Sequence, residues 1–94
     1  MISYSKDPLR YVLNLAYHQA MEGKGKERHA DDRPFLCQAW HSITRAVGIG
    51  FPSGQALKKI QESQRLSKEA AIKELLGAIN YLSMAVIAKM EEKQ

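Results

Sequence analysis

Three aromatic or polar side chains near the start of the chain are spaced so that they could bind one ligand together. Tyr11, Asn14 and His18 lie three and four residues apart, so a helix would place all three on one face. A tyrosine ring can stack on a purine, a contact worth about 1–3 kcal/mol per base, and the amide and imidazole groups can form hydrogen bonds. The stripe is therefore a candidate binding face, although spacing alone favours the alternative that Tyr11 packs against a neighbouring helix.

A basic loop is predicted shortly after this stripe. Residues 23–33 contain two glycines, four lysine or arginine residues and no apolar side chain larger than alanine. Lys24 and Lys26 could supply cations, and the glycines let backbone N–H groups approach a phosphate closely. The order of residues is not that of a Walker motif. Solvated loop charges are the alternative interpretation of the two lysines.

No arrangement of reactive residues predicts an enzyme. His18, His29 and His41 lack the spacing of metal ligands. Acidic residues such as Glu69, Glu74, Glu91 and Glu92 are spread out or terminal, unlike the paired carboxylates of helical magnesium sites. Residues 29–32 match the histidine-aspartate motif of phosphohydrolases only in part, because its further histidine and aspartate have no clear counterparts. Cys37 lies in an apolar segment without a neighbouring base, which favours a place in the core. We expect no catalytic residues, no metal and no cofactor.

The size and composition of the chain limit its class. It has 94 residues, a net charge of +4 and one cysteine. We expect a single helical domain over residues 1–94, and because so short a chain buries a small share of its surface, self-association should stabilise it. The absence of a disulfide pair, of a signal peptide and of an apolar run of about 20 residues predicts a cytoplasmic protein that does not enter a membrane. Its mild basicity suits an anionic partner.

The predicted elements are all helices, and two of them belong to the first half of the chain. One helix covers residues 7–22, where Asp7 is a natural N-cap and Pro8 suits the first helical position. A second is expected to begin at Asp32 and to end at a turn rich in glycine and proline, residues 48–54. Its apolar residues recur about every four positions and should face the core: Phe35, Ala39, Ile43 and Val47.

Two further helices are expected to form a hairpin. The third covers about residues 53–64 and should bury one face (Ala56, Leu57, Ile60) and expose the other (Lys58, Lys59, Glu62). After a tight turn, the fourth and longest covers residues 68–92, with Ser67 as its N-cap. Its apolar surface is wider than one neighbouring helix can cover, which favours packing against other subunits. The predicted fold is all-α: a small helical hairpin with a short N-terminal helix that assembles into a homo-oligomer.

Three stretches of the chain resemble a hairpin domain of phage proteins that sequester cyclic nucleotides. They are residues 23–30, 48–66 and 74–82, and their most specific strings are Lys-Lys-Ile-x-Glu-Ser-x-Arg-Leu and Leu-Leu-Gly-Ala-Ile-Asn-Tyr-Leu. The domain is shared by anti-CBASS sponges and by certain anti-Thoeris sponges. The similarity covers most of the chain from Gly23 onward, and the short length suits the anti-CBASS branch.

The resemblance implies a ligand and a site. Subunits of that family assemble into hexamers that hold cyclic dinucleotides such as cGAMP between subunits, with an aromatic ring stacked on a base and a lysine in the same pocket. Tyr11 and Lys26 match these two roles by position and chemistry. Asn14 and His18 join the candidate site because they share the stripe of Tyr11, and Lys24 joins it from the same basic loop.

A second site and a mode of action also follow from the resemblance. The family binds cyclic trinucleotides near threefold contacts, for which Arg65 is the candidate here and Arg28 a weaker one. The protein is then expected to bind these messengers without cleaving them, in the cytoplasm of an infected bacterial host cell, and so to prevent the activation of CBASS effectors.

Two other classes stay open. A small basic nucleic-acid-binding phage protein would show affinity that falls steeply with salt. However, the turn over residues 48–53 is too long for a standard helix-turn-helix, and only Lys58 and Lys59 would contact phosphates from the third helix. We therefore expect no nucleic acid polymer as a partner. A purely structural phage protein is the other alternative.

Overall fold

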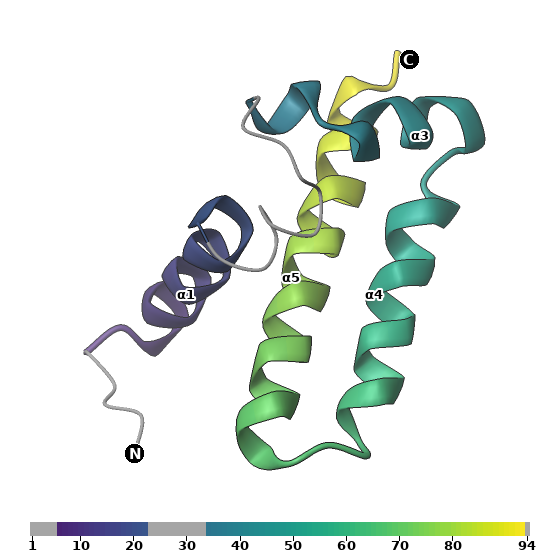
Figure 1. Ribbon diagram of the computed structural model, residues 1–94. Helices are drawn as coiled ribbons and strands as arrows, with labels where there is room; N and C mark the ends of the chain where they lie inside the picture. Colours follow the sequence, from purple (N-terminus) through teal and green to yellow (C-terminus); the bar gives the residue numbers. More distant parts are fainter. Residues whose placement is uncertain (1–5, 23–33, 94) are drawn as a thin grey trace.

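The computed structural model describes residues 6–22 and 34–93, and every regular element in this part of the chain is helical (Figure 1). In chain order these elements are α1 (Pro8–Glu22), the 3-10 helix η1 (Phe35–Cys37), α3 (Ala39–Val47), α4 (Gly50–Ser63) and α5 (Lys68–Glu91). α4 and α5 form an antiparallel hairpin, α1 lies on the other side of α5, and α3 crosses the end of the hairpin. The predicted all-α class is confirmed.

The first and last helices begin at their predicted caps. Asp7 Oδ1 accepts a hydrogen bond from the Arg10 N–H at 3.0 Å, and the Ser67 hydroxyl accepts one from the Ala70 N–H at 3.4 Å. Such bonds satisfy N–H groups that have no partner within the helix. The observed bounds of α1 and α5 agree with the predicted ones to within one residue.

The predicted second helix is wrong as a continuous element. After η1, Gln38 adopts an extended conformation, with φ −81° and ψ 162°. The Phe35 carbonyl accepts hydrogen bonds from the Gln38 N–H at 3.2 Å and from Trp40 Nε1 at 2.9 Å. The break satisfies the indole N–H of a ring that is only 1% exposed, which an unbroken helix would not do. The start expected at Asp32 lies outside the described residues.

The face of α3 that meets the core also differs from the predicted one. Trp40 and Thr44 are buried, whereas Ile43 and Val47 are exposed. Cys37, which was expected in the core, is exposed as well. The indole ring buries more apolar surface than an aliphatic side chain does, so Trp40 selects the face by which α3 docks.

The turn between α3 and α4 is shorter than predicted. α4 begins at Gly50 rather than near Ser53, because Pro52 falls in its first turn, where a missing N–H costs no hydrogen bond. Gly48 has a φ of +90°, which residues with a side chain rarely adopt, and its N–H donates to the Thr44 carbonyl at 2.7 Å. Most of the glycine- and proline-rich segment therefore starts a helix instead of forming a loop.

The hairpin buries aromatic and small residues and leaves many large aliphatic ones outside. The buried apolar cluster consists of Trp40, Ala56, Ala78, Tyr81 and Met84. On α5, Leu82, Val86 and Met90 are exposed. On α4, Ala56 is buried as predicted, but Leu57 and Ile60 are exposed and Lys59 is buried, contrary to the predicted faces. The bounds of α1 and α5 were thus predicted well, whereas the second helix, the start of α4 and the faces by which α3 and α4 pack were not.

α5 is long and apolar enough, judged by length and composition alone, to cross a membrane. No such segment was predicted from the sequence. The core helices of soluble proteins meet the same criteria, and α5 lies between α1 and α4 with part of its surface buried against them (Figure 1).

Candidate functional site

The candidate ligand face lies on α1. Tyr11 is half-buried, whereas Asn14 and His18 are exposed. Because residues three and four apart on a helix are neighbours, the three side chains share one face, as their spacing indicated. Their role in binding a ligand stays a prediction.

Glu22 is a further member of this face that was not predicted from the sequence. His18 Nδ1 lies 3.1 Å from Glu22 Oε2, and the His18 ring stands edge-on to the Tyr17 ring, with 6.0 Å between their centroids. A carboxylate acceptor favours a proton on Nδ1, which leaves Nε2 available to a ligand. The spacing of four residues was a signal that could have identified Glu22.

Two hydrogen bonds between side chain and main chain join α1 to α5. Asn80 Nδ2 donates to the Ala16 carbonyl at 2.9 Å, and Gln19 Nε2 donates to the Lys73 carbonyl at 3.2 Å. Ala16 is buried at this contact. These bonds could not be predicted from sequence, because their partners are 64 and 54 residues apart.

Of the basic candidate residues, the structure describes only Arg65. Lys24, Lys26 and Arg28 lie outside the described residues. Arg65 is exposed in the turn between α4 and α5, where its N–H donates to the Glu62 carbonyl at 3.1 Å. Arg65 is therefore carried by a different element from the α1 face.

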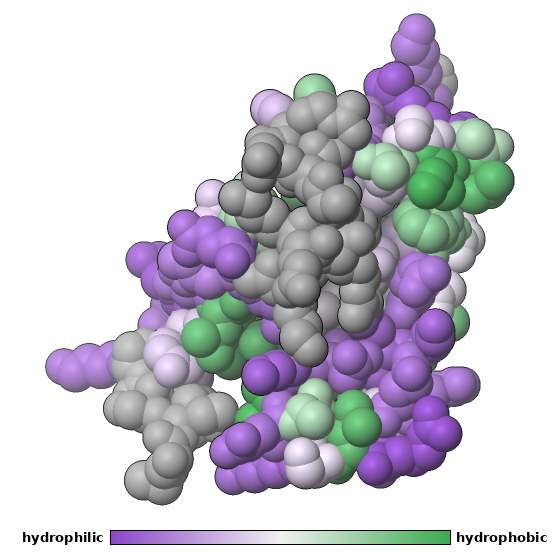
Figure 2. All heavy atoms as spheres, in the orientation of Figure 1, coloured by the Kyte–Doolittle hydropathy of each residue, from purple (hydrophilic) through white to green (hydrophobic). Residues whose placement is uncertain are grey.

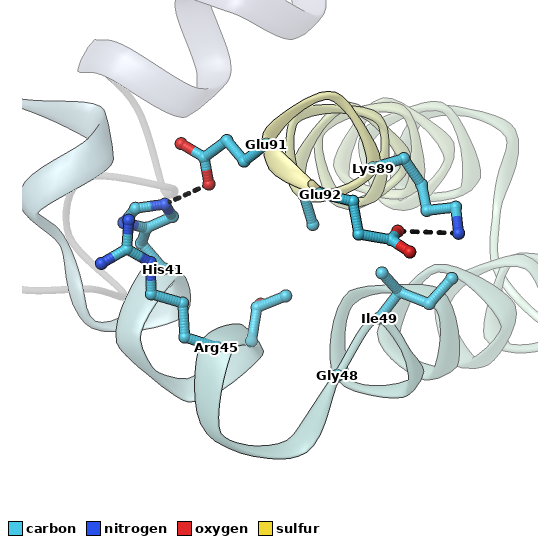
Figure 3. A pocket seen from close by; sticks show the side chains of 9 residues that line it. His41, Arg45, Gly48, Ile49, Lys89, Glu91 and Glu92 are labelled. Atoms are coloured by element: carbon cyan, nitrogen blue, oxygen red, sulfur yellow. Dashed lines mark hydrogen bonds and ion pairs between the residues drawn. The ribbon is translucent and has the colours of Figure 1, made fainter. Parts of the chain in front are cut away.

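A recess of about 450 Å³ lies between α3 and the end of α5 (Figure 3). His41 Nε2 is 2.7 Å from Glu91 Oε1, and Lys89 Nζ is 2.8 Å from Glu92 Oε2. Most charged groups of the recess thus pair with one another, so it shows no charge preference that would identify a ligand. Nothing in the sequence indicated this recess, since its two walls come from distant parts of the chain.

Possible metal ligands do not cluster in the part of the chain that the structure describes. No three histidine, cysteine, aspartate or glutamate side chains within residues 6–22 and 34–93 are grouped so that they could hold a metal ion.

Comparisons with known proteins identify no family for the chain. No protein-family model matches it, and neither a curated protein nor a solved structure is significantly similar to it. Function is therefore inferred from the residues of the chain itself.

Proposed function

We propose that this is a phage anti-defence protein that binds and sequesters cyclic oligonucleotide second messengers without cleaving them. Its ligands are cyclic dinucleotides such as cGAMP and, at a second site that includes Arg65, cyclic trinucleotides. Acting in the cytoplasm of an infected bacterial cell, it keeps CBASS effectors inactive. The observation that carries this proposal is the stripe of Tyr11, Asn14 and His18 on one face of α1, with Asn14 and His18 exposed, together with the sequence resemblance to anti-CBASS sponges.

Twofold symmetry between subunits explains how so small a chain would bind a cyclic dinucleotide tightly. A cyclic dinucleotide has two bases and two phosphates in nearly twofold arrangement, so a pocket across a symmetric pair of subunits offers it Tyr11 and Lys26 twice. Nanomolar affinity corresponds to about −12 kcal/mol, and two stacked bases supply about 2–6 kcal/mol of it. Charge-assisted hydrogen bonds to the phosphates supply much of the remainder, and no bond in the ligand has to break.

Exposed apolar side chains on several helices support self-association. On α1, Leu9, Leu13 and Tyr17 are exposed at intervals of four residues, so they form a stripe along the helix. Figure 2 shows another apolar patch over the corner between α3 and α4, where Val47 and Ile49 are exposed. Apolar surfaces of this kind are typical of subunit interfaces. We propose a homo-oligomer, and six subunits is the number that the resemblance implies.

The burial of Lys59 weakens the nucleic-acid-binding alternative. That alternative requires Lys58 and Lys59 as phosphate contacts on α4, but Lys59 is buried and ion-paired with Glu74 at 3.5 Å. Only Lys58 of the two is exposed. A helix with one such cation offers little for a DNA or RNA backbone.

Calorimetric titration with cGAMP tests the proposed function. We expect tight binding by the unmodified protein and by Tyr11→Phe, which keeps the stacking ring. Tyr11→Ala should lose about 30-fold or more in affinity, because a twofold site loses two stacks of about 1–3 kcal/mol each. If the unmodified protein binds neither cGAMP nor a cyclic trinucleotide, the proposed function is wrong.

A further inference from the structure

The contact between α1 and α5 includes two reciprocal hydrogen bonds. Each helix contributes one amide side chain and one main-chain acceptor: Asn80 on α5 donates to Ala16, and Gln19 on α1 donates to Lys73. Ala16 is 1% exposed and brings only a methyl group to the contact. A methyl group does not interlock with its neighbours as a large side chain does, so packing at Ala16 itself does little to fix the rotation of α1.

Two separate bonds fix an orientation that one bond would not. The α5 partners, Lys73 and Asn80, are seven residues apart, which corresponds to about 10 Å along the helix axis. A single hydrogen bond would leave α1 free to pivot about it, whereas two at this separation prevent the pivot. Hydrogen bonds are also directional, so they hold the helix in one rotation about its own axis.

The rotation of α1 decides where the ligand face points. Successive residues of an α-helix are about 100° apart, which places Ala16 on the opposite side of α1 from the stripe of Tyr11, Asn14 and His18. Holding Ala16 against α5 therefore turns the stripe away from α5. This agrees with the exposure of Asn14 and His18.

We propose that Asn80 and Gln19 are positioning residues for the ligand face of α1. They hold the helix in the binding orientation before the ligand arrives. The free energy of binding then does not include the entropic cost of ordering α1. Neither residue touches the ligand. This inference rests on the proposed function of the α1 face, but its structural half can be measured without any nucleotide.

Asn80→Leu and Gln19→Leu test the inference, because leucine has nearly the size of these side chains but donates no hydrogen bond. Gln61→Leu on α4 is the matched control, since Gln61 is exposed and lies on a helix away from the α1–α5 contact. Amide hydrogen exchange is measured for each variant, followed by calorimetric titration with cGAMP. We expect exchange in α1 to accelerate about tenfold or more in both contact variants while α4 and α5 keep their protection, as for local opening. Affinity should fall about tenfold in the same two variants and stay unchanged in Gln61→Leu.

The possible outcomes separate the two proposals. Unchanged exchange in α1, or an equal acceleration throughout the chain, would overturn the positioning role, because the amides would then be irrelevant or merely structural. Unchanged cGAMP affinity in variants with a loosened α1 would overturn it as well, while the proposed function stands. Failure of the unmodified protein to bind any cyclic nucleotide would overturn both.

Discussion

Lys59 on α4 and Gly77 on α5 are in close steric contact where the two helices pack together. The Lys59 side chain is buried, its Nζ lies 3.5 Å from Glu74 Oε2, and it stands 5.9 Å from the centre of the Tyr81 ring. A carboxylate and an aromatic face both compensate an ammonium group for the loss of water. The side chain fits because a Cβ at residue 77 would lie only 2.9 Å from Lys59 Cδ. The glycine inside the long helix therefore makes room for the lysine.

Gly77→Ala and Gly54→Ala should have opposite effects on stability. Gly54 is exposed on α4, and a Cβ added there would meet nothing within 4 Å, so alanine should stabilise by about 0.5–1 kcal/mol through helix propensity. Gly77→Ala should destabilise by about 1–3 kcal/mol, because Lys59 must move. Urea denaturation of both variants measures the difference. Equal stabilisation by the two substitutions would contradict the account of Lys59.

Which site residues could be predicted from sequence depends on the distance between partners along the chain. Tyr11, Asn14 and His18 are grouped by helical periodicity alone, and Glu22 could have been added by the same rule. Asn80 could not, because its partner Ala16 lies on another helix and their approach is decided by how the two helices dock.

At the scale of elements, α1 and α3 are attached to α5 in different ways. α1 uses hydrogen bonds from amide side chains, whereas α3 inserts Trp40 into the core and adds the ion pair of His41 with Glu91. The positions and N-caps of α1 and α5 were predictable because they depend on local sequence. The docking face of α3 was not, because burial of the indole ring is decided by the neighbours it meets in three dimensions.

His41 and His18 each contact a glutamate, and substituting each in turn should show different losses of stability. The His41 contact joins two helices, whereas the His18 contact lies within one helix. The His41 side chain is 13% exposed and its partner Glu91 37%, and the pair joins α3 to the last turn of α5. His18 pairs with Glu22 within α1, and both side chains are mostly exposed. We expect His41→Ala to lower the free energy of unfolding by about 1–2 kcal/mol and His18→Ala to lower it by less than about 0.5 kcal/mol. Equal losses in chemical denaturation would show that His41 does not attach α3.

At the scale of the whole molecule, many large apolar side chains are exposed, and this distribution supports the proposed oligomer. The core is built from aromatic and small residues, while stripes of leucine, valine and methionine face outward on α1 and α5. This excess of apolar surface was predicted from the width of the apolar face on the longest helix. Which residues would stay exposed was not predictable, because that depends on how α4 and α1 pack against α5.

Leu82→Glu should therefore break the proposed oligomer. Leu82 is 49% exposed and shares an outward stripe of α5 with Val86 and Met90. A carboxylate there would be desolvated in an interface but tolerated on a free helix surface. Light scattering after size-exclusion chromatography should show a smaller species for Leu82→Glu, whereas Ser83→Glu, about 100° further round the helix, should keep the mass of the unmodified protein. An unchanged mass for Leu82→Glu would place the interface elsewhere.

Recovery of the bound ligand tests the central claim, sequestration without cleavage, most directly. The protein is incubated with excess cGAMP, separated from free nucleotide and denatured by heat, and the released material is identified by chromatography and mass spectrometry. The account predicts intact cGAMP in a fixed ratio to subunits, unchanged after long incubation. Recovery of a linear or hydrolysed product, or of no nucleotide at all, would contradict it.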